Sequence, residues 1–450
     1  MDEAGEQNPT NDSIYIPKYV AKSSLYSMYQ FDWISRKLNA SELPSTSSFY
    51  NIFDSQFSHV KFLKQTILGR CDFCMSIPTQ KSKITSEVDK NAFLEACAQH
   101  RELYTRERTA YSNRTFTSKT HPEQMLHLAF DCPDGYDVPH IIPVTKETSN
   151  LPKVSISAVG TINHSAQIRD YMFFLDEYKK DSNLMLTCFY LHILQHFSTT
   201  GNHPPILWLQ ADNCFKENKN RWMMGFCYWL VHIGWFREIM ISMLPPGHTH
   251  IDIDQMFSTL SMFLDRHSVE FIADILQAVN SAYKKENTKP KAAFLPVVFN
   301  FVGFLALFVH DLSGLNSAHV YLFHKLANGK VGMKVKQWHS TNSEWRGSVA
   351  SPDEWITLMH QFPTGFPETI APHPVEDMLD IETVRKYNLW MSDKGLLSWQ
   401  SYLQELSLDI HHMYPIPEDY DQYHHVCIIN ASFVFLCLTI CTAHYITAGY

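Results

Sequence analysis

Residues 206–257 read ILWLQADNCFKENKNRWMMGFCYWLVHIGWFREIMISMLPPGHTHIDIDQMF, and this stretch decides the expected fold. Its first part, 206–212, is a short apolar run that ends in an acid, which is typical of a buried strand. Aromatic and aliphatic residues then recur at helical spacing and predict a helix over 217–236. A second apolar run predicts a strand over 238–244, and one apolar face predicts a helix over 251–264.

The same pattern continues upstream of this stretch. Apolar runs predict strands at 125–131, 154–162 and 171–176, and helical spacing predicts a helix over 182–197. Residues 122–270 therefore have the order β-β-β-α-β-α-β-α. This is the order of the ribonuclease H-like α/β fold, a mixed sheet flanked by helices on both faces.

Composition places the chain among globular proteins. It has 450 residues, of which 45% are hydrophobic, 13% aromatic and 18% charged. These values exclude global disorder and the collagen-like and coiled-coil classes. The length allows two or three domains. We expect a flexible lead-in, a cysteine/histidine module with a helix, the ribonuclease H-like core, an α+β extension of that core, an acidic tail and an apolar terminal segment, at 1–50, 51–120, 122–270, 271–350, 351–425 and 426–450.

Charge is unevenly distributed along the chain. The net charge is −9, and residues 351–425 hold 13 acidic and 3 basic side chains. Residues 61–119 hold 11 basic and 6 acidic ones. The overall acidity argues against a uniform nucleic-acid-binding surface, but it leaves room for a basic N-terminal region that contacts phosphates. DNA is the expected partner, RNA is not excluded, and a homo-oligomer is allowed.

Targeting signals and cysteine use favour an intracellular location, with the nucleus expected. The first residues are polar and acidic, and ten cysteines are too few for a disulfide scaffold. Residues 426–446 are apolar and about long enough to span a bilayer. No Lys or Arg flanks this segment. A buried terminal helix or strand is therefore favoured over a membrane anchor.

Acidic residues stand at three places where an open sheet gathers its ligands. Asp131 ends the first strand, Asp212 ends the fourth, and Asp252 and Asp254 begin the helix after the fifth. Two strand-end carboxylates and one from a neighbouring helix suit a pair of Mg²⁺ or Mn²⁺ ions. Either Asp252 or Asp254 can be the third acid. The competing interpretation is that each acid forms a turn or an N-cap.

Two polar strings surround these acids. After Asp212 the chain continues with a dense group of polar side chains, which is either a solvated helix cap or a polar site; its supporting candidates are Asn213, Glu217, Asn218 and Asn220. Before the last helix, His248 and His250 alternate with the two acids. They can bind a transition metal, or they can orient the acids through hydrogen bonds.

The strings DNCxxENKNR (212–221) and GHTHxDxDxxF (247–257) resemble a transposon-derived domain family of unknown function. HLAFD (127–131) and KxWxxxxxEW (336–345) add to the resemblance, which covers about residues 60–346. The family's layout is similar to that of the DDE/D transposases and integrases. The resemblance implies that Asp131 and Asp212 match the first two acids of that group. The third acid here is Asp rather than the commoner Glu.

The N-terminal module offers a second site. Cys71 and Cys74 form a CxxC pair, and Cys97 with His100 forms a CxxH pair. Ligand types and pair spacings are compatible with a structural, tetrahedral zinc ion. The competing interpretation is that these are ordinary buried thiols beside a solvated histidine.

Three functions follow from these patterns. The leading one is a transposase-derived nuclease or strand-transfer protein that cleaves phosphodiesters of DNA with metal ions. The alternative keeps the fold as a domesticated or decayed module that only binds nucleic acid or protein. The third is a membrane-tethered protein in which the acid pattern is accidental.

Overall fold

A computed structural model describes ten stretches of the chain: 6–7, 14–16, 22–39, 42–62, 71–211, 219–310, 318–340, 344–348, 351–373 and 379–408. The chain divides into two compact units, residues 1–80 and 81–450. The expected terminal segment at 426–450 lies outside the described residues.

The first unit combines a small sheet with short helices. Its strands pair in the order β1-β2-β3, with bounds Glu6–Gln7, Ile14–Ile16 and Val60–Phe62. Its helices are α1 (Lys22–Ser35), α2 (Thr46–Gln56) and α3 (Asp72–Lys83). Aromatic rings join the first two helices, since the ring of Phe49 lies 5.3 Å from the rings of Tyr26 and Tyr29.

The second unit is built on a large mixed sheet. Eight of its strands follow the spatial order β10-β7-β6-β4-β8-β9-β12-β13. Their bounds are β4 Met125–Asp131, β6 Val154–Asn163, β7 Ile168–Phe174, β8 Ile206–Ala211, β9 Glu238–Met243, β10 Lys291–Phe294, β12 Val320–Lys325 and β13 Val331–Lys336, while β5 (Tyr136–Val138) pairs with β6. Strands β4, β6 and β7 form an antiparallel meander, and β8 and β9 add in parallel beside β4. The expected α/β class is confirmed.

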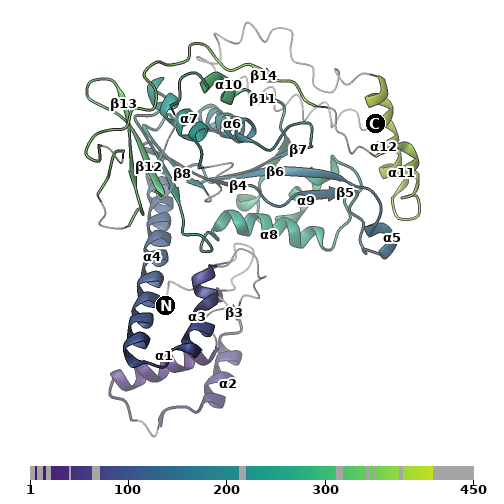
Figure 1. Cartoon of the computed structure of the whole chain (residues 1–450). Helices are drawn as coiled ribbons and strands as arrows, with labels where there is room; N and C mark the ends of the chain where they lie inside the picture. The colour runs from purple at the N-terminus through teal and green to yellow at the C-terminus, as the bar shows by residue number, and fades with distance from the viewer. Residues whose placement is uncertain are drawn as a thin grey trace. The chain divides into compact units, whose positions relative to one another are not determined.

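Helices cover both faces of this sheet (Figure 1). One face is covered by α6 (Ser182–Thr200), α7 (Arg221–His232) and α10 (Phe301–Leu305). The opposite face carries α8 (Asp252–Leu264) and α9 (Asp274–Ala282). Short elements connect or extend these layers, namely α5 (Lys146–Ser149), the 3₁₀ helix Glu286–Thr288, and β11 (Val298–Phe299) paired with β14 (Thr369–Ile370).

Two hydrophobic cores follow from the alternation of side chains along the strands. In β4, Leu126, Leu128 and Phe130 belong to the core under α6 and α7. Ala129 belongs to the core under α8 and α9. Because successive strand residues point to opposite faces, His127 and Asp131 share the face of Ala129.

Helix α4 (Glu87–Thr120) is longer than the sequence pattern predicted, which was a helix from about Asp89 to Arg108. Its buried residues in the second half are mostly polar, so apolar periodicity could not reveal them. They recur at intervals of three and four and lie on one side of the helix: Tyr104, Glu107, Tyr111, Arg114 and Ser118.

The region after residue 290 differs most from expectation. A single buried helix was predicted over 295–309, but the structure has the strand β11 followed by the one-turn helix α10. Asn300 explains the break, because its side chain accepts a hydrogen bond from Gly303 N–H and caps α10. In the acidic segment, α11 (Ile381–Arg385) and α12 (Asp393–Leu408) add the fully buried Trp399 to the second core.

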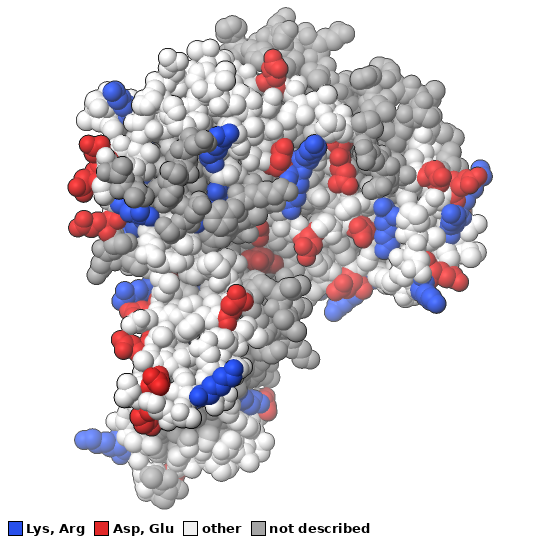
Figure 2. Space-filling view, viewed as in Figure 1, with Lys and Arg blue, Asp and Glu red and all other residues white. Residues whose placement is uncertain are grey.

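Charges on the face in Figure 2 are mixed, with Lys and Arg scattered among Asp and Glu of the described residues. Within the described part of the chain, no helix is both long and apolar enough to cross a membrane.

Candidate functional site

Asp131 is the last residue of β4, and its side chain lies on the face that α8 covers. Its Oδ1 atom accepts a hydrogen bond of 2.8 Å from the N–H of Cys132. This contact within the chain orients the carboxylate at the strand end.

Helix α8 packs directly on the backbone of β6 next to Asp131. Gly160 is the register partner of Asp131 across the β4–β6 pair. A Cβ atom on Gly160 would lie 2.2 Å from Cε1 of Phe257 and 2.9 Å from Cε of Met256. Only a residue without a side chain allows this approach, so Gly160 sets the height of α8 above the strand that carries Asp131.

Asp252, the first residue of α8, is held by two other elements. Its Oδ1 atom accepts a hydrogen bond of 2.6 Å from the Tyr111 hydroxyl of α4. Its Oδ2 atom lies 3.7 Å from Nε2 of His164, the residue that follows β6. The side chain of Asp252 remains 31% exposed, so its carboxylate is reachable from solvent.

The hydrogen-bond chain assigns the proton positions around Tyr111. The phenol has one hydrogen, and a carboxylate only accepts, so Tyr111 donates to Asp252. The phenol oxygen, 2.9 Å from Nε2 of His164, therefore accepts from that nitrogen. Burial lowers the pKa of His164 to about 4, although the charge of Asp252 opposes the shift. Burial, followed by the charge of Asp252, raises the pKa of Tyr111 well above its usual value.

His127 lies below this chain and is fully buried. Its ring is 4.7 Å from the ring of His164, and its carbonyl accepts from the N–H of His164. Burial, and then the charge of His164, lowers the pKa of His127 well below its usual value. Its Nε2 atom has no hydrogen-bond partner among the described residues. The site thus contains a neutral imidazole with an unsatisfied nitrogen.

Arg114 ties α4 to the two strands that follow β4 in the sheet. Its Nη2 atom donates to Oε1 of Gln210 at 3.0 Å and to Oγ of Ser242 at 2.9 Å. Its guanidinium also lies over the ring of Trp208, 5.6 Å from the centroid. Burial lowers the pKa of Arg114 to about 10, so the buried side chain stays charged at neutral pH.

Asp254 and His250 serve the start of α8. The Oδ2 atom of Asp254 accepts a hydrogen bond of 2.9 Å from the N–H of Ile251. Its Oδ1 atom lies 3.4 Å from Nδ1 of His250. Of the two arrangements that the sequence left open, the structure has the helical one, in which His250 and Asp254 share a face.

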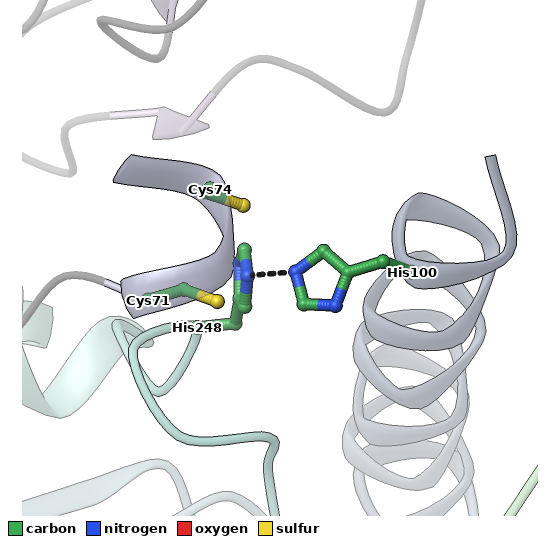
Figure 3. A group of neighbouring side chains, drawn as sticks. All are labelled: Cys71, Cys74, His100 and His248. Atoms are coloured by element: carbon green, nitrogen blue, oxygen red, sulfur yellow. Dashed lines mark hydrogen bonds between the residues drawn. The ribbon is translucent and has the colours of Figure 1, made fainter. Parts of the chain in front are cut away.

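His248 has a different environment. Its Nε2 atom lies 3.0 Å from Nε2 of His100 on α4, and its ring stacks on Tyr104 with centroids 4.1 Å apart (Figure 3). Burial lowers the pKa of His248 to about 4, and the charges of His100, Arg108 and His250 act in the same direction. His248 was predicted to orient the acids, but it contacts α4 instead.

The polar string after β8 is only partly described. Asp212, Asn213, Glu217 and Asn218 lie outside the described residues. Asn220 is the N-cap of α7: its side-chain oxygen accepts from the N–H groups of Trp222 and Met223, at 2.9 and 3.0 Å. The helix thus begins after Asn220, four residues later than the sequence predicted.

Sequence reasoning missed Tyr111, Arg114, His127 and His164. The signal for the first two was the polar stripe of α4, whose spacing matches a helix although its residues are not apolar. His127 stands inside the string HLAFD, but an isolated histidine within an apolar run gives no warning of its partners.

Comparison with known proteins adds the following findings. Residues 146–341 match the model of a domain of unknown function, DUF7869. The match includes Asp252 and ends before the expected KxWxxxxxEW string does; it begins after Asp131. Similar solved structures include the crystal structure of the Mos1 strand transfer complex, with a TM-score of 0.24 and 10% identity over 60% of this chain and 92% of that chain. No curated protein matches the chain.

Proposed function

We propose that the chain is a ribonuclease H-like, transposase-derived protein that cleaves or transfers phosphodiesters of DNA with Mg²⁺ or Mn²⁺. Asp131, Asp212 and Asp252 are the proposed metal ligands. DNA is the proposed substrate because the sequence strings at 212–221 and 247–257 resemble the transposon-derived family.

The observation that carries the proposal is the strand order β7-β6-β4-β8-β9, with helices after β7, β8 and β9. It supports the ribonuclease H-like interpretation of the element order. In this sheet β4 and β8 are neighbours and parallel, so their carboxyl ends meet at one edge. Asp131 ends β4, and Asp212 is the residue after the last one of β8.

The fit of the donor set favours Asp252 over Asp254 as the third ligand. Carboxylate oxygens are the donors that Mg²⁺ and Mn²⁺ prefer, and Asp252 lies on the covered polar face with one oxygen beyond hydrogen-bond distance of His164. Asp254 instead accepts from the backbone at the start of its own helix. Two such ions, when bound, would activate the attacking oxygen and stabilise the leaving one.

The remaining polar residues have positioning roles in this proposal. Tyr111 fixes the orientation of Asp252 by donating to Oδ1. Arg114 fixes β8 and β9 against α4, and its positive charge is bound to Gln210, two residues before Asp212 in the chain. Both roles concern orientation and charge, and neither residue needs to touch the scissile phosphate.

A binding module without catalysis is the second candidate. It is favoured by one observation: Asp252 and Asp254 each already have a structural hydrogen bond, to Tyr111 and to the backbone of Ile251 respectively. In this case both acids would only fasten α8 to its surroundings.

Cleavage of labelled double-stranded DNA with Mg²⁺ or Mn²⁺ by the purified full chain tests the proposal. The variants are Asp131→Asn, Asp212→Asn and Asp252→Asn. Asp265→Asn, an exposed change at the other end of α8, is the matched control. We expect the three variants to lose cleavage and the control to keep it.

Two results would contradict the assignment. Retained cleavage in Asp212→Asn would remove the metal site. Loss of cleavage in Asp254→Asn with retention in Asp252→Asn would exchange the third ligand. A wild-type chain that binds DNA without cleaving it would favour the binding module.

A further inference from the structure

Two imidazoles of the second unit face each other through the same kind of nitrogen. His100 lies on α4 and His248 in the loop before α8, and their Nε2 atoms are 3.0 Å apart (Figure 3). Two nitrogen ligands of one tetrahedral zinc ion lie about 3.3 Å apart, given Zn–N bonds of roughly 2.0–2.1 Å. The pair therefore has nearly the separation that two ligands of a single ion require.

The pair is also fixed in this geometry from both sides. Tyr104, one turn after His100 on α4, stacks on His248 with an interplanar angle of 9°. Arg108, a further turn along, donates a hydrogen bond to the carbonyl of His250. Contacts on both sides of His248 thus hold its loop against α4 before any ion binds.

Two thiols stand at the start of a helix in the first unit. Cys71 immediately precedes α3, and Cys74 lies in its first turn. The Cys71 carbonyl accepts from the N–H of Met75, which continues the helical hydrogen bonding back to Cys71. A spacing of three residues on a helix puts both side chains on one side of that turn, as Figure 3 shows. The two sulfurs form the pair found in half of a Cys₂His₂ site.

We propose that one zinc ion binds the thiolates of Cys71 and Cys74 together with the imidazoles of His100 and His248. Among the described residues, these four form the group with the ligand types for a metal ion. Each pair supplies two ligands, whereas a structural zinc site needs four. Neither pair can close a tetrahedron alone, so the ion would make the link.

This ligand set replaces Cys97 of the sequence-based prediction with His248. Cys97 and His100 were paired because they are three residues apart on one helix. His100 instead has its partner 148 residues further along the chain. Local spacing could not predict such a partner, since only the fold brings the β9–α8 loop to α4.

The zinc ion would have a structural role distinct from the proposed nuclease site. His248 lies four residues before Asp252, so an ion at His248 would anchor the loop that leads into α8. The proposal does not depend on catalysis, because all four ligands differ from the proposed Mg²⁺ or Mn²⁺ ligands.

Metal analysis of the purified full chain tests this site. We expect about one zinc ion per chain in the wild type and in Cys97→Ser. Zinc should be lost from Cys71→Ser, Cys74→Ser, His100→Asn and His248→Asn. Replacement of zinc by Co²⁺ in the wild type should give tetrahedral d–d bands and thiolate-to-cobalt charge-transfer absorption.

The outcomes separate the alternatives even where a variant folds poorly. A folded wild type that holds neither zinc nor Co²⁺ with these bands would overturn the proposal. So would loss of zinc from Cys97→Ser combined with full zinc in a folded His248→Asn, which would restore the sequence-based ligand set. Metal content does not report on DNA cleavage, so failure of this site and failure of the nuclease proposal can be told apart.

Discussion

The hydroxyl of Tyr111 donates a 2.6 Å hydrogen bond to the carboxylate of Asp252, a residue 141 positions further along the chain. The contact joins α4 to the first residue of α8. Because His164 is within hydrogen-bond distance of the same hydroxyl, three elements meet at one phenol oxygen. The orientation of Asp252 therefore depends on a residue that lies outside both sequence strings.

Tyr111→Phe should loosen the start of α8. Hydrogen bonds to charged groups contribute about 1.5–3 kcal/mol, and those between neutral groups about 0.5–1.5 kcal/mol. We expect a loss of unfolding free energy toward the lower end of the first range, since Asp252 is partly exposed and water can replace the phenol. Urea denaturation measures this loss.

Tyr387→Phe is the comparison for this change, because the Tyr387 hydroxyl donates to the neutral carbonyl of Pro152 at 2.6 Å. The loss in Tyr111→Phe should exceed the loss in Tyr387→Phe. Equal losses would show that Asp252 gains nothing from its partner.

Gly160→Ala should displace α8. The new Cβ would lie 2.2 and 2.6 Å from two ring atoms of Phe257, both well inside van der Waals contact. Overpacking of this kind costs about 1–3 kcal/mol of unfolding free energy. Thermal unfolding of Gly160→Ala measures the cost.

A second change tests the cause of that loss. Phe257→Leu removes the ring atoms that the new Cβ would meet, so the double variant should be less destabilised than the sum of the two single changes. Strict additivity would show that the helix does not rest on Gly160.

The sequence predicted the central strands well because their apolar runs are short and bounded. The predicted strand 125–131 matches β4, and the predicted 154–162 differs from β6 (Val154–Asn163) by one residue. Helix α6 was predicted over 182–197 and extends to Thr200. In each of these elements, burial of apolar side chains decides the structure, and the pattern is local.

The sequence failed where polar residues are buried or where a contact is distant. Helix α4 buries Glu107 against the N–H groups of His339 and Ser340, a contact that no periodicity reveals. The partner of His100 also depended on the fold. The acids could be placed on their elements, but the contacts of Asp252 could not, since Tyr111 comes from a helix that was expected to end at Arg108.

Arg114→Lys should destabilise the second unit although it keeps the charge. The guanidinium donates to Gln210 and Ser242 at once, which a lysine ammonium at the end of a flexible stem cannot reproduce in the same geometry. A buried charge without its full set of partners costs several kcal/mol, so we expect a loss of about 2–4 kcal/mol in unfolding free energy.

Arg101→Lys is the matched control, since Arg101 is exposed on the same helix. A surface change of this kind usually alters the unfolding free energy by less than about 0.5 kcal/mol. Denaturant unfolding of the two variants side by side gives the comparison, and equal stabilities would mean that Arg114 is not a structural link.

Asp170 on β7 should make stability depend on pH. Its carboxylate is buried, and its Oδ2 atom lies 3.3 Å from Nδ1 of His192 on α6. Burial raises the pKa of Asp170 to about 7, against the opposing charge of Lys291. Burial also lowers the pKa of His192 to about 3, so both groups are neutral between these values.

The sign of the effect follows from the raised pKa of Asp170. The folded state holds the proton more tightly than the unfolded chain, whose Asp has its usual pKa of 3.8. The stability from this proton is complete below pH 3.8 and is lost as the pH rises toward 7. Asp170→Asn, which cannot ionise, should therefore gain about 2 kcal/mol of unfolding free energy relative to the wild type between about pH 5 and pH 8. Urea denaturation at the two pH values measures this gain, and a difference that stays constant would show that burial does not hold a proton on Asp170.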